Sequence, residues 1–117
     1  MATELEGNEK LQRFIQLLAD LNHQTVDALK TGDTRVLVKM NDTVEEMYSI
    51  QHGGTEDAYT AIEEDAQIIY KNFNAAVTML KSFEGNKIDK TTSEAVRIFV
   101  RNIFDANVRI VLAYGLA

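Results

Sequence analysis

Apolar residues recur at spacings of three and four along most of the chain, and this periodicity constrains the fold more than any other feature of the sequence. The longest run alternates between the two spacings without a break: Tyr59, Ile62, Ala66, Ile69, Phe73, Ala76, Leu80 and Phe83. Side chains at this period share one face of an α-helix. We therefore expect one long helix here, with a continuous apolar seam turned toward a core.

Three further segments have the same period. Their members are Leu11, Phe14, Leu18, Leu21, Thr25 and Ala28 in the first, Leu37, Met40, Val44 and Met47 in the second, and Val96, Phe99, Ile103, Ala106, Ile110 and Ala113 in the last. The chain contains no proline, the residue that most disrupts a helix interior. A strand at 35–40 is locally plausible from its β-branched residues, but no second strand is available to pair with it. The sequence therefore predicts an all-α fold.

Glycine-containing stretches separate the four helical segments. They are Lys30–Thr34, Gln51–Asp57 and Phe83–Thr92. Within them Gly32, Gly53 and Gly85 each follow a helical run, at the place of a left-handed C-cap. Thr91 and Glu94 have the spacing of a capping box at the start of the last helix, and Asn8 is placed to start the first.

These boundaries predict the architecture. We expect one domain over residues 1–117, an antiparallel four-helix bundle of up-down-up-down topology in which the third and fourth helices are the longest. Residues 1–8 are expected to form a flexible arm. A length of 117 residues and an apolar content of 45% suffice for one core.

Charge and cysteine content exclude several classes of function. The net charge of -6 disfavours a nucleic-acid-binding protein, because binding to phosphates requires a basic surface. The absence of cysteine rules out disulfides and thiolate chemistry. The first ten residues lack the features of a signal peptide, and no apolar run is long enough to span a membrane. We therefore expect a cytoplasmic protein without a membrane contact.

The last helical segment is unusually apolar. On a helical wheel its apolar residues fill an arc of roughly 180°, wider than a helix needs to face one core. Arginines and further apolar residues lie on the opposite side. One interpretation makes this the central helix, with arginine stems covering stray apolar residues. The other makes the excess face an interface for a second copy or another protein. The candidate interface residues are Ile98, Arg101, Val108, Leu112 and Tyr114.

Two asparagines fall within apolar arcs. Asn22 lies in that of the first helix and Asn107 in that of the last. A polar side chain at a seam position costs stability unless it is paired, yet it can fix register and oligomeric state. We interpret each as a buried amide with satisfied hydrogen bonds; contact with a ligand is the alternative.

Two acidic pairs raise the question of a metal-dependent enzyme. Glu45 and Glu46 lie on the second predicted helix, and Glu63 and Glu64 on the third. All-α nucleotide pyrophosphatases bind magnesium with Glu-Glu-x-x-Glu and a later Glu-x-x-Asp, because a hard cation requires converging carboxylates. Here Ser49 and Gln67 stand at the third carboxylate positions, and the last helix has no Glu-x-x-Asp. Solvated helix faces and helix starts explain these acids better.

Other catalytic patterns are also incomplete. Asp20 and His23 are the nearest match to a di-metal Glu-x-x-His motif, and His52 has no companion. Phosphotransfer at His23 is disfavoured because Asp27, four residues later, would repel a phosphoryl group. We assign no catalytic residue, no metal ligand and no cofactor.

The sequence therefore favours a non-catalytic protein for protein binding or regulation, self-associating as a homodimer through its last helix, alone or together with the third. Two alternatives stay open. One is a divergent magnesium-dependent nucleotide pyrophosphatase that uses Glu45, Glu46, Glu63 and Glu64. The other is an acidic inhibitor or immunity-type protein that occupies a basic site on its target, as the net charge of -6 permits.

Overall fold

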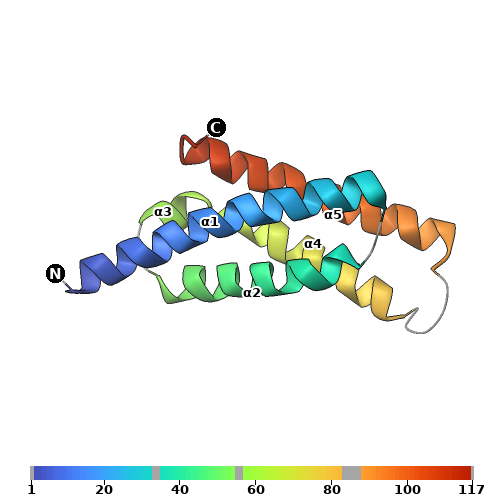
Figure 1. The fold of residues 1–117 in the computed structure, drawn as a ribbon, viewed down its shortest axis with the longest axis horizontal. Coiled ribbons are helices and arrows are strands. Elements are labelled where there is room, and N and C mark those ends of the chain that lie inside the picture. Colours follow the sequence, from blue (N-terminus) through green and yellow to red (C-terminus); the bar gives the residue numbers. More distant parts are fainter. Residues whose placement is uncertain (1, 33–34, 55–56, 83–87, 117) are drawn as a thin grey trace.

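The protein is all-helical throughout the residues that the structure describes (Figure 1). The computed structural model describes residues 2–32, 35–54, 57–82 and 88–116, with side chains from Glu9 onward. In these ranges the helices are α1 (Ala2–Thr31), α2 (Val36–Gly53), α3 (Asp57–Ala61), α4 (Glu63–Lys81) and α5 (Lys90–Ala113), and there is no strand. The predicted all-α class is confirmed, and the contacts between the helices are consistent with a bundle.

The third predicted helix is divided into α3 and α4. Ile62 leaves helical geometry, with φ -115° and ψ 13°, and its N–H bonds to the carbonyl of Tyr59 in a tight turn. Three carboxylates in the first turn of α4 favour a new helix start there, because they lie at the positive end of its dipole. Tyr59 and Ile62 are both buried in spite of the break. The prediction of one unbroken helix is therefore wrong. The apolar seam nevertheless identifies residues of the core. Its last member, Phe83, lies outside the described residues.

Helix lengths also differ from the expectation. The first helix is the longest of those described, with 30 residues, against 24 in α5 and 19 in α4. It begins at Ala2, before the predicted start at Asn8. Nothing in residues 2–8 stops a helix, since the segment has no proline and a single glycine costs only about 1 kcal/mol.

The helix ends show which capping predictions hold. Gly32 adopts a positive φ of 66° and donates to the carbonyl of Ala28, as expected of a C-cap. Gly53 belongs to α2, whose cap is Gly54 in an extended conformation, so a left-handed cap at Gly53 is wrong. Gly85 lies outside the described residues.

The start of α5 is capped by Asp89, not by Thr91. The Asp89 carboxylate accepts a hydrogen bond of 2.7 Å from the backbone N–H of Thr92. Hydrogen bonds from Thr92 lower the pKa of Asp89. Because Asp89 is the N-cap residue, α5 begins at Lys90, one residue before Thr91.

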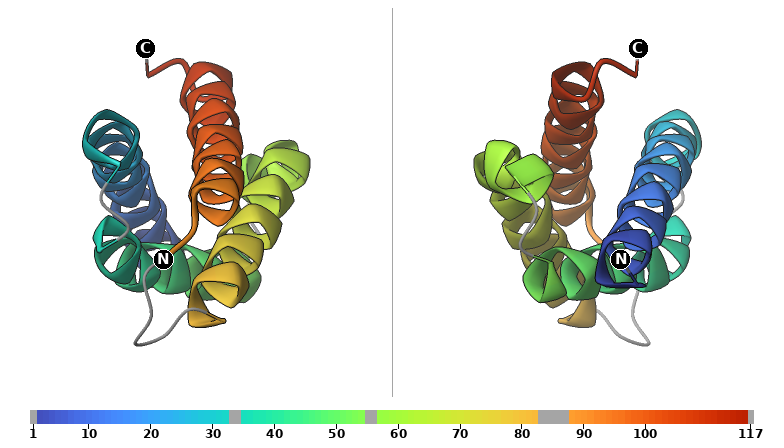
Figure 2. Two further views of the ribbon diagram at one scale, coloured as in Figure 1. Left: turned by 90° about the vertical axis from the view of Figure 1, so that its right-hand side faces the viewer. Right: turned by 90° about the vertical axis from the view of Figure 1, so that its left-hand side faces the viewer.

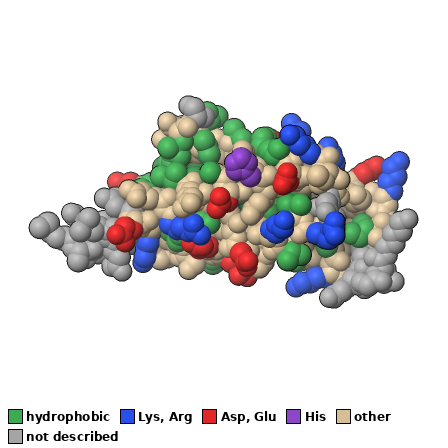
Figure 3. All heavy atoms as spheres, viewed as in Figure 1, with side chains coloured by type: hydrophobic (Ala, Val, Ile, Leu, Met, Phe, Trp, Pro, Cys, Tyr) green, Lys and Arg blue, Asp and Glu red, His purple; other side chains and the backbone are tan. Residues whose placement is uncertain are grey.

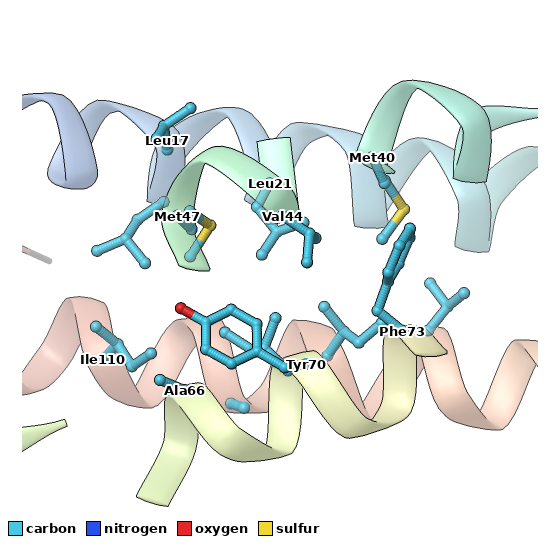
Figure 4. Close-up of a cluster of buried hydrophobic side chains, with 14 of the residues drawn as sticks. Leu17, Leu21, Met40, Val44, Met47, Ala66, Tyr70, Phe73 and Ile110 are labelled. Carbon is cyan, nitrogen blue, oxygen red and sulfur yellow. The ribbon is translucent and has the colours of Figure 1, made fainter. Parts of the chain in front are cut away.

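The helices pack in two pairs, α1 with α2 and α4 with α5, which are joined mainly through α1 and α5 (Figure 2). The contact between α2 and α4 is much smaller. Side chains from α1, α2, α4 and α5 meet in the core shown in Figure 4. Its fully buried apolar members include Phe14, Leu18, Leu21, Met40, Met47, Ile62, Ile69, Ile103 and Ile110.

The position of Ile103 in this core gives a test of the packing. We expect Ile103→Ala to lower the free energy of unfolding by about 2–5 kcal/mol, because it leaves a cavity in a close-packed interior. Val38→Ala, at a side chain of α2 that is 75% exposed, should change it by less than about 0.5 kcal/mol. Urea unfolding measures both. Equal effects of the two substitutions would contradict this packing, as would a well-folded Ile103→Asp or Ile110→Asp variant.

Candidate functional site

The outward face of α5 carries a stripe of residues at spacings of three and four. Its members are Ile98, Arg101, Asp105, Val108 and Leu112, which we call the outer stripe. Ile98 and Leu112 are 61% and 59% exposed, whereas Ile103 and Ile110 on the opposite face are fully buried. Because one face is committed to the core, the outer stripe is free to contact another molecule.

The three arginines of α5 have different surroundings. Arg97 donates to the carbonyl of Leu29 on α1 at 2.9 Å, and Arg109 donates to Asp65 on α4 at 2.7 Å. These two arginines hold α5 to the helices on either side. Arg101, which lies between them, contacts Asp105 on its own helix at 3.4 Å; the Arg101 side chain is 67% exposed and that of Asp105 46%. Within the described residues, Arg101 reaches no other helix.

Next to the outer stripe, an apolar groove of about 430 Å³ runs between α1 and α5. It is lined by Ile15, Leu18, Ala19, Asn22, Val108, Val111 and Leu116. Figure 3 shows hydrophobic side chains gathered over the C-terminal half of α5. Val108 belongs to both the groove and the outer stripe, so the two features form one continuous surface.

Tyr114, a predicted interface residue, makes a contact within the chain. Its hydroxyl donates to the carbonyl of Ala58 on α3 at 2.9 Å. Burial raises the pKa of Tyr114 to about 12. This residue attaches the end of α5 to α3. The other four predicted interface residues all belong to the outer stripe, whose fifth member, Asp105, was not predicted.

The two asparagines differ in burial. Asn107 is fully buried, and its Nδ2 donates to the carbonyl of Leu18 on α1 at 2.9 Å. Its Oδ1 is also buried and accepts no hydrogen bond within the described part of the chain. Asn22 is only partly buried and lines the groove between α1 and α5. Asn107 is therefore a half-satisfied amide that links α1 to α5.

An aromatic and polar cluster on α2 and α4 was not found from the sequence. The rings of Tyr48 and His52 stack at 3.8 Å, and Tyr70 meets Tyr48 edge-on at 5.2 Å. The Tyr70 hydroxyl donates to the buried Gln51 at 2.6 Å. Burial raises the pKa of Tyr70. The i, i+4 spacing of Tyr48 and His52 is the signal that could have revealed the stacked pair.

A small hollow of about 150 Å³ lies beside this cluster, between the end of α2 and the start of α4. Its lining is mainly polar: Gln51, His52, Gly54, Tyr59, Thr60, Glu63 and Gln67. These side chains can exchange hydrogen bonds with solvent or a small polar molecule.

The acidic pairs do not form a metal centre in the described part of the chain. The carboxylate of Glu46 is bound by Arg13 on α1, which lowers the pKa of Glu46, while Glu45 is exposed. Glu63 and Glu64 occupy the first turn of α4, beside a broad open depression. No group of three His, Asp or Glu side chains that could hold a metal ion is found among the residues described.

Comparison of the chain with protein-family models, with curated proteins and with solved structures gives no match. Within the described ranges, no helix combines the length and the apolar character that crossing a bilayer requires.

The half-satisfied Asn107 allows a paired test. We expect Asn107→Leu to leave stability within about 1 kcal/mol of the wild type, because an apolar group of similar volume removes the unpaired Oδ1. Asn107→Asp should cost about 3 kcal/mol or more at pH 7, since it buries a charge without a cation beside it. Urea unfolding of the Asp variant should show stability returning as the pH is lowered and the carboxyl group is protonated. If Asn107→Leu lost as much stability as Asn107→Asp, this account would be contradicted.

The raised pKa of Tyr114 predicts a loss of stability in alkali. Between pH 10, where an unfolded tyrosine titrates, and about 12, the folded state keeps a proton that the unfolded state has released. Stability therefore falls as the pH rises through this window, by about 1–2 kcal/mol for this residue after allowance for solvent screening. Between pH 9 and 12 the free energy of unfolding should fall less steeply for Tyr114→Phe than for the wild type. Identical slopes for the two proteins would contradict the assignment.

Proposed function

We propose that this protein is a non-catalytic interaction protein that self-associates as a homodimer through the outer face of α5. The observation that carries the proposal is the outer stripe. Its large apolar residues, Ile98 and Leu112, are more than half exposed. Leaving such side chains in water forgoes the free energy of burying them, about 1.5–3 kcal/mol for each when burial is complete.

The dimensions of the surface fit a helix-mediated contact. At 1.5 Å per residue, the 24 residues of α5 span about 36 Å. The apolar groove beside the stripe widens the available surface beyond one helix. A stable interface buries about 1,200–2,000 Å² in total, with an apolar centre and a polar rim. The outer stripe and the groove together offer such a centre, and Arg101 and Asp105 offer polar groups.

The scaffold in this proposal is an antiparallel four-helix bundle of up-down-up-down topology, with α3 as a short addition before α4. Within this scaffold α5 packs on both α1 and α4. A cytoplasmic location, expected from the sequence, belongs to the same proposal.

A catalytic function has less support from the geometry. Glu46 is engaged by Arg13, and Asp65 is engaged by Arg109. A carboxylate already paired with an arginine is less available as a ligand for a cation. The remaining acids of the two pairs, Glu45, Glu63 and Glu64, are exposed. Among the described residues they belong to no group of three side chains that could hold a metal ion. We therefore favour protein binding over a magnesium-dependent hydrolase.

A substitution in the outer stripe tests the proposal. Native mass spectrometry and light scattering should find a wild-type dimer, and Leu112→Asp should raise its dissociation constant at least about 30-fold, because it places a charge in an apolar contact. The matched control is Val38→Asp on α2, at a side chain that is 75% exposed and outside α5. This control should dimerise normally. A monomeric wild type, or equal behaviour of the two variants, would refute the proposal.

A further inference from the structure

We propose that the two copies pair through α5 in an antiparallel, symmetric arrangement, in which Arg101 of each copy lies opposite Asp105 of the other. This inference rests on the proposed self-association and specifies its orientation and register. It starts from the charged pair of the outer stripe, Arg101 and Asp105, which contact each other and no other helix in the described part of the chain. Arg97 and Arg109 are held by α1 and α4, so Arg101 and Asp105 are the charged residues left at the centre of the outward face.

Symmetry fixes which residues can meet. In a two-fold antiparallel pair of helices, residues equally far from the axis along the two chains face each other. Arg101 and Asp105 face each other when the axis passes at the height of Ile103. The same register places Ile98 of one copy opposite Val108 of the other. Two reciprocal ion pairs at the centre are then flanked on both sides by apolar contacts.

Other pairings of the same stripe bring like charges together. A parallel pair would set Arg101 against Arg101 and Asp105 against Asp105. An antiparallel pair centred on Asp105 would match Ile98 with Leu112, but it would oppose the two Asp105 carboxylates and set Arg101 against Arg109. Like charges across an interface disfavour the wrong arrangement strongly. The register centred on Ile103 instead places opposite charges together at the centre. It also sets Arg97 of one copy against Arg109 of the other, but these two arginines are held within their own chain by the Leu29 carbonyl and by Asp65.

The contact within one chain leaves both charged groups available. The Arg101 to Asp105 distance of 3.4 Å exceeds the 2.7–2.9 Å of a strong charge-assisted hydrogen bond, and both side chains are exposed. An exposed pair of this kind contributes little to the stability of its own helix. Each carboxylate has further lone pairs, so Asp105 can accept from the arginine of a second copy. The ion pairs then select the register, while the apolar residues supply most of the affinity.

Charge reversal gives a first test. Arg101→Asp and Asp105→Arg each place like charges at both reciprocal contacts, so each variant alone should dimerise at least about tenfold more weakly than the wild type. Mixed in equal amounts, the two variants should form a heterodimer in which every contact is attractive. Arg101 and Asp105 are on the surface, so circular dichroism should show unchanged helix content for both. Single variants that dimerise as tightly as the wild type would overturn the proposal.

Disulfide trapping separates the antiparallel register from a parallel one. The chain has no cysteine, so one introduced thiol per variant can report one contact. Ile98→Cys and Val108→Cys, mixed and mildly oxidised, should give a mixed disulfide that mass spectrometry identifies. Ile98→Cys alone should not cross-link within a dimer, because its two copies lie about 15 Å apart along the axis, beyond disulfide reach. Efficient cross-linking of Ile98→Cys to itself would show parallel pairing and overturn the register.

The outcomes distinguish this inference from the proposed function. A monomeric wild type in native mass spectrometry refutes both. A wild-type dimer that is weakened by Leu112→Asp, but whose Ile98→Cys and Val108→Cys variants give no mixed disulfide, keeps α5 as the interface and rejects the register. A dimer that gives the mixed disulfide, fails to cross-link through Ile98→Cys alone and is rescued by mixing the charge variants supports the full arrangement.

Discussion

The burial of one face of α5 between α1 and α4 is the interaction on which the rest of the structure depends. The pair α1–α2 and the pair α4–α5 are joined mainly through this helix, because α2 and α4 contact each other little. Ile103, Ala106 and Ile110 are completely buried along that face. Once these residues are committed to the core, the helix has only one direction left in which to present the outer stripe.

The polar residues of α5 define this orientation further. Asn107 donates to the carbonyl of Leu18 on α1, and Arg109 donates to Asp65 on α4. Each of these two bonds contributes modestly to stability, but together they restrain rotation of α5 about its axis. The unpaired Oδ1 of Asn107 carries a cost that is consistent with a role in fixing the register of α1 and α5. The outer stripe is therefore presented by a helix held on both sides.

Much of the core could be predicted from the periodicity of the sequence. The break between α3 and α4 and the residue that caps α5 could not. The seam through Ile62 and Ile69 does identify buried residues, because burial follows the helical period on either side of a short turn. The turn at Ile62 was missed because local apolar spacing cannot show where one helix stops and the next one starts. Asp89 was overlooked as the cap of α5 because Thr91, two residues later, offered an equally good local pattern.

By itself the sequence determined an all-α protein, the faces that form its core and the surplus apolar residues of its last helix. These follow from period and composition, which are local properties of the chain. The tertiary structure alone decided that Arg97 and Arg109 are engaged by neighbouring helices and that Arg101, among the residues described, is not. It also showed that Glu46 faces Arg13. The physical reason is that a charge finds its partner on another helix, and packing between distant segments sets which residues come within reach.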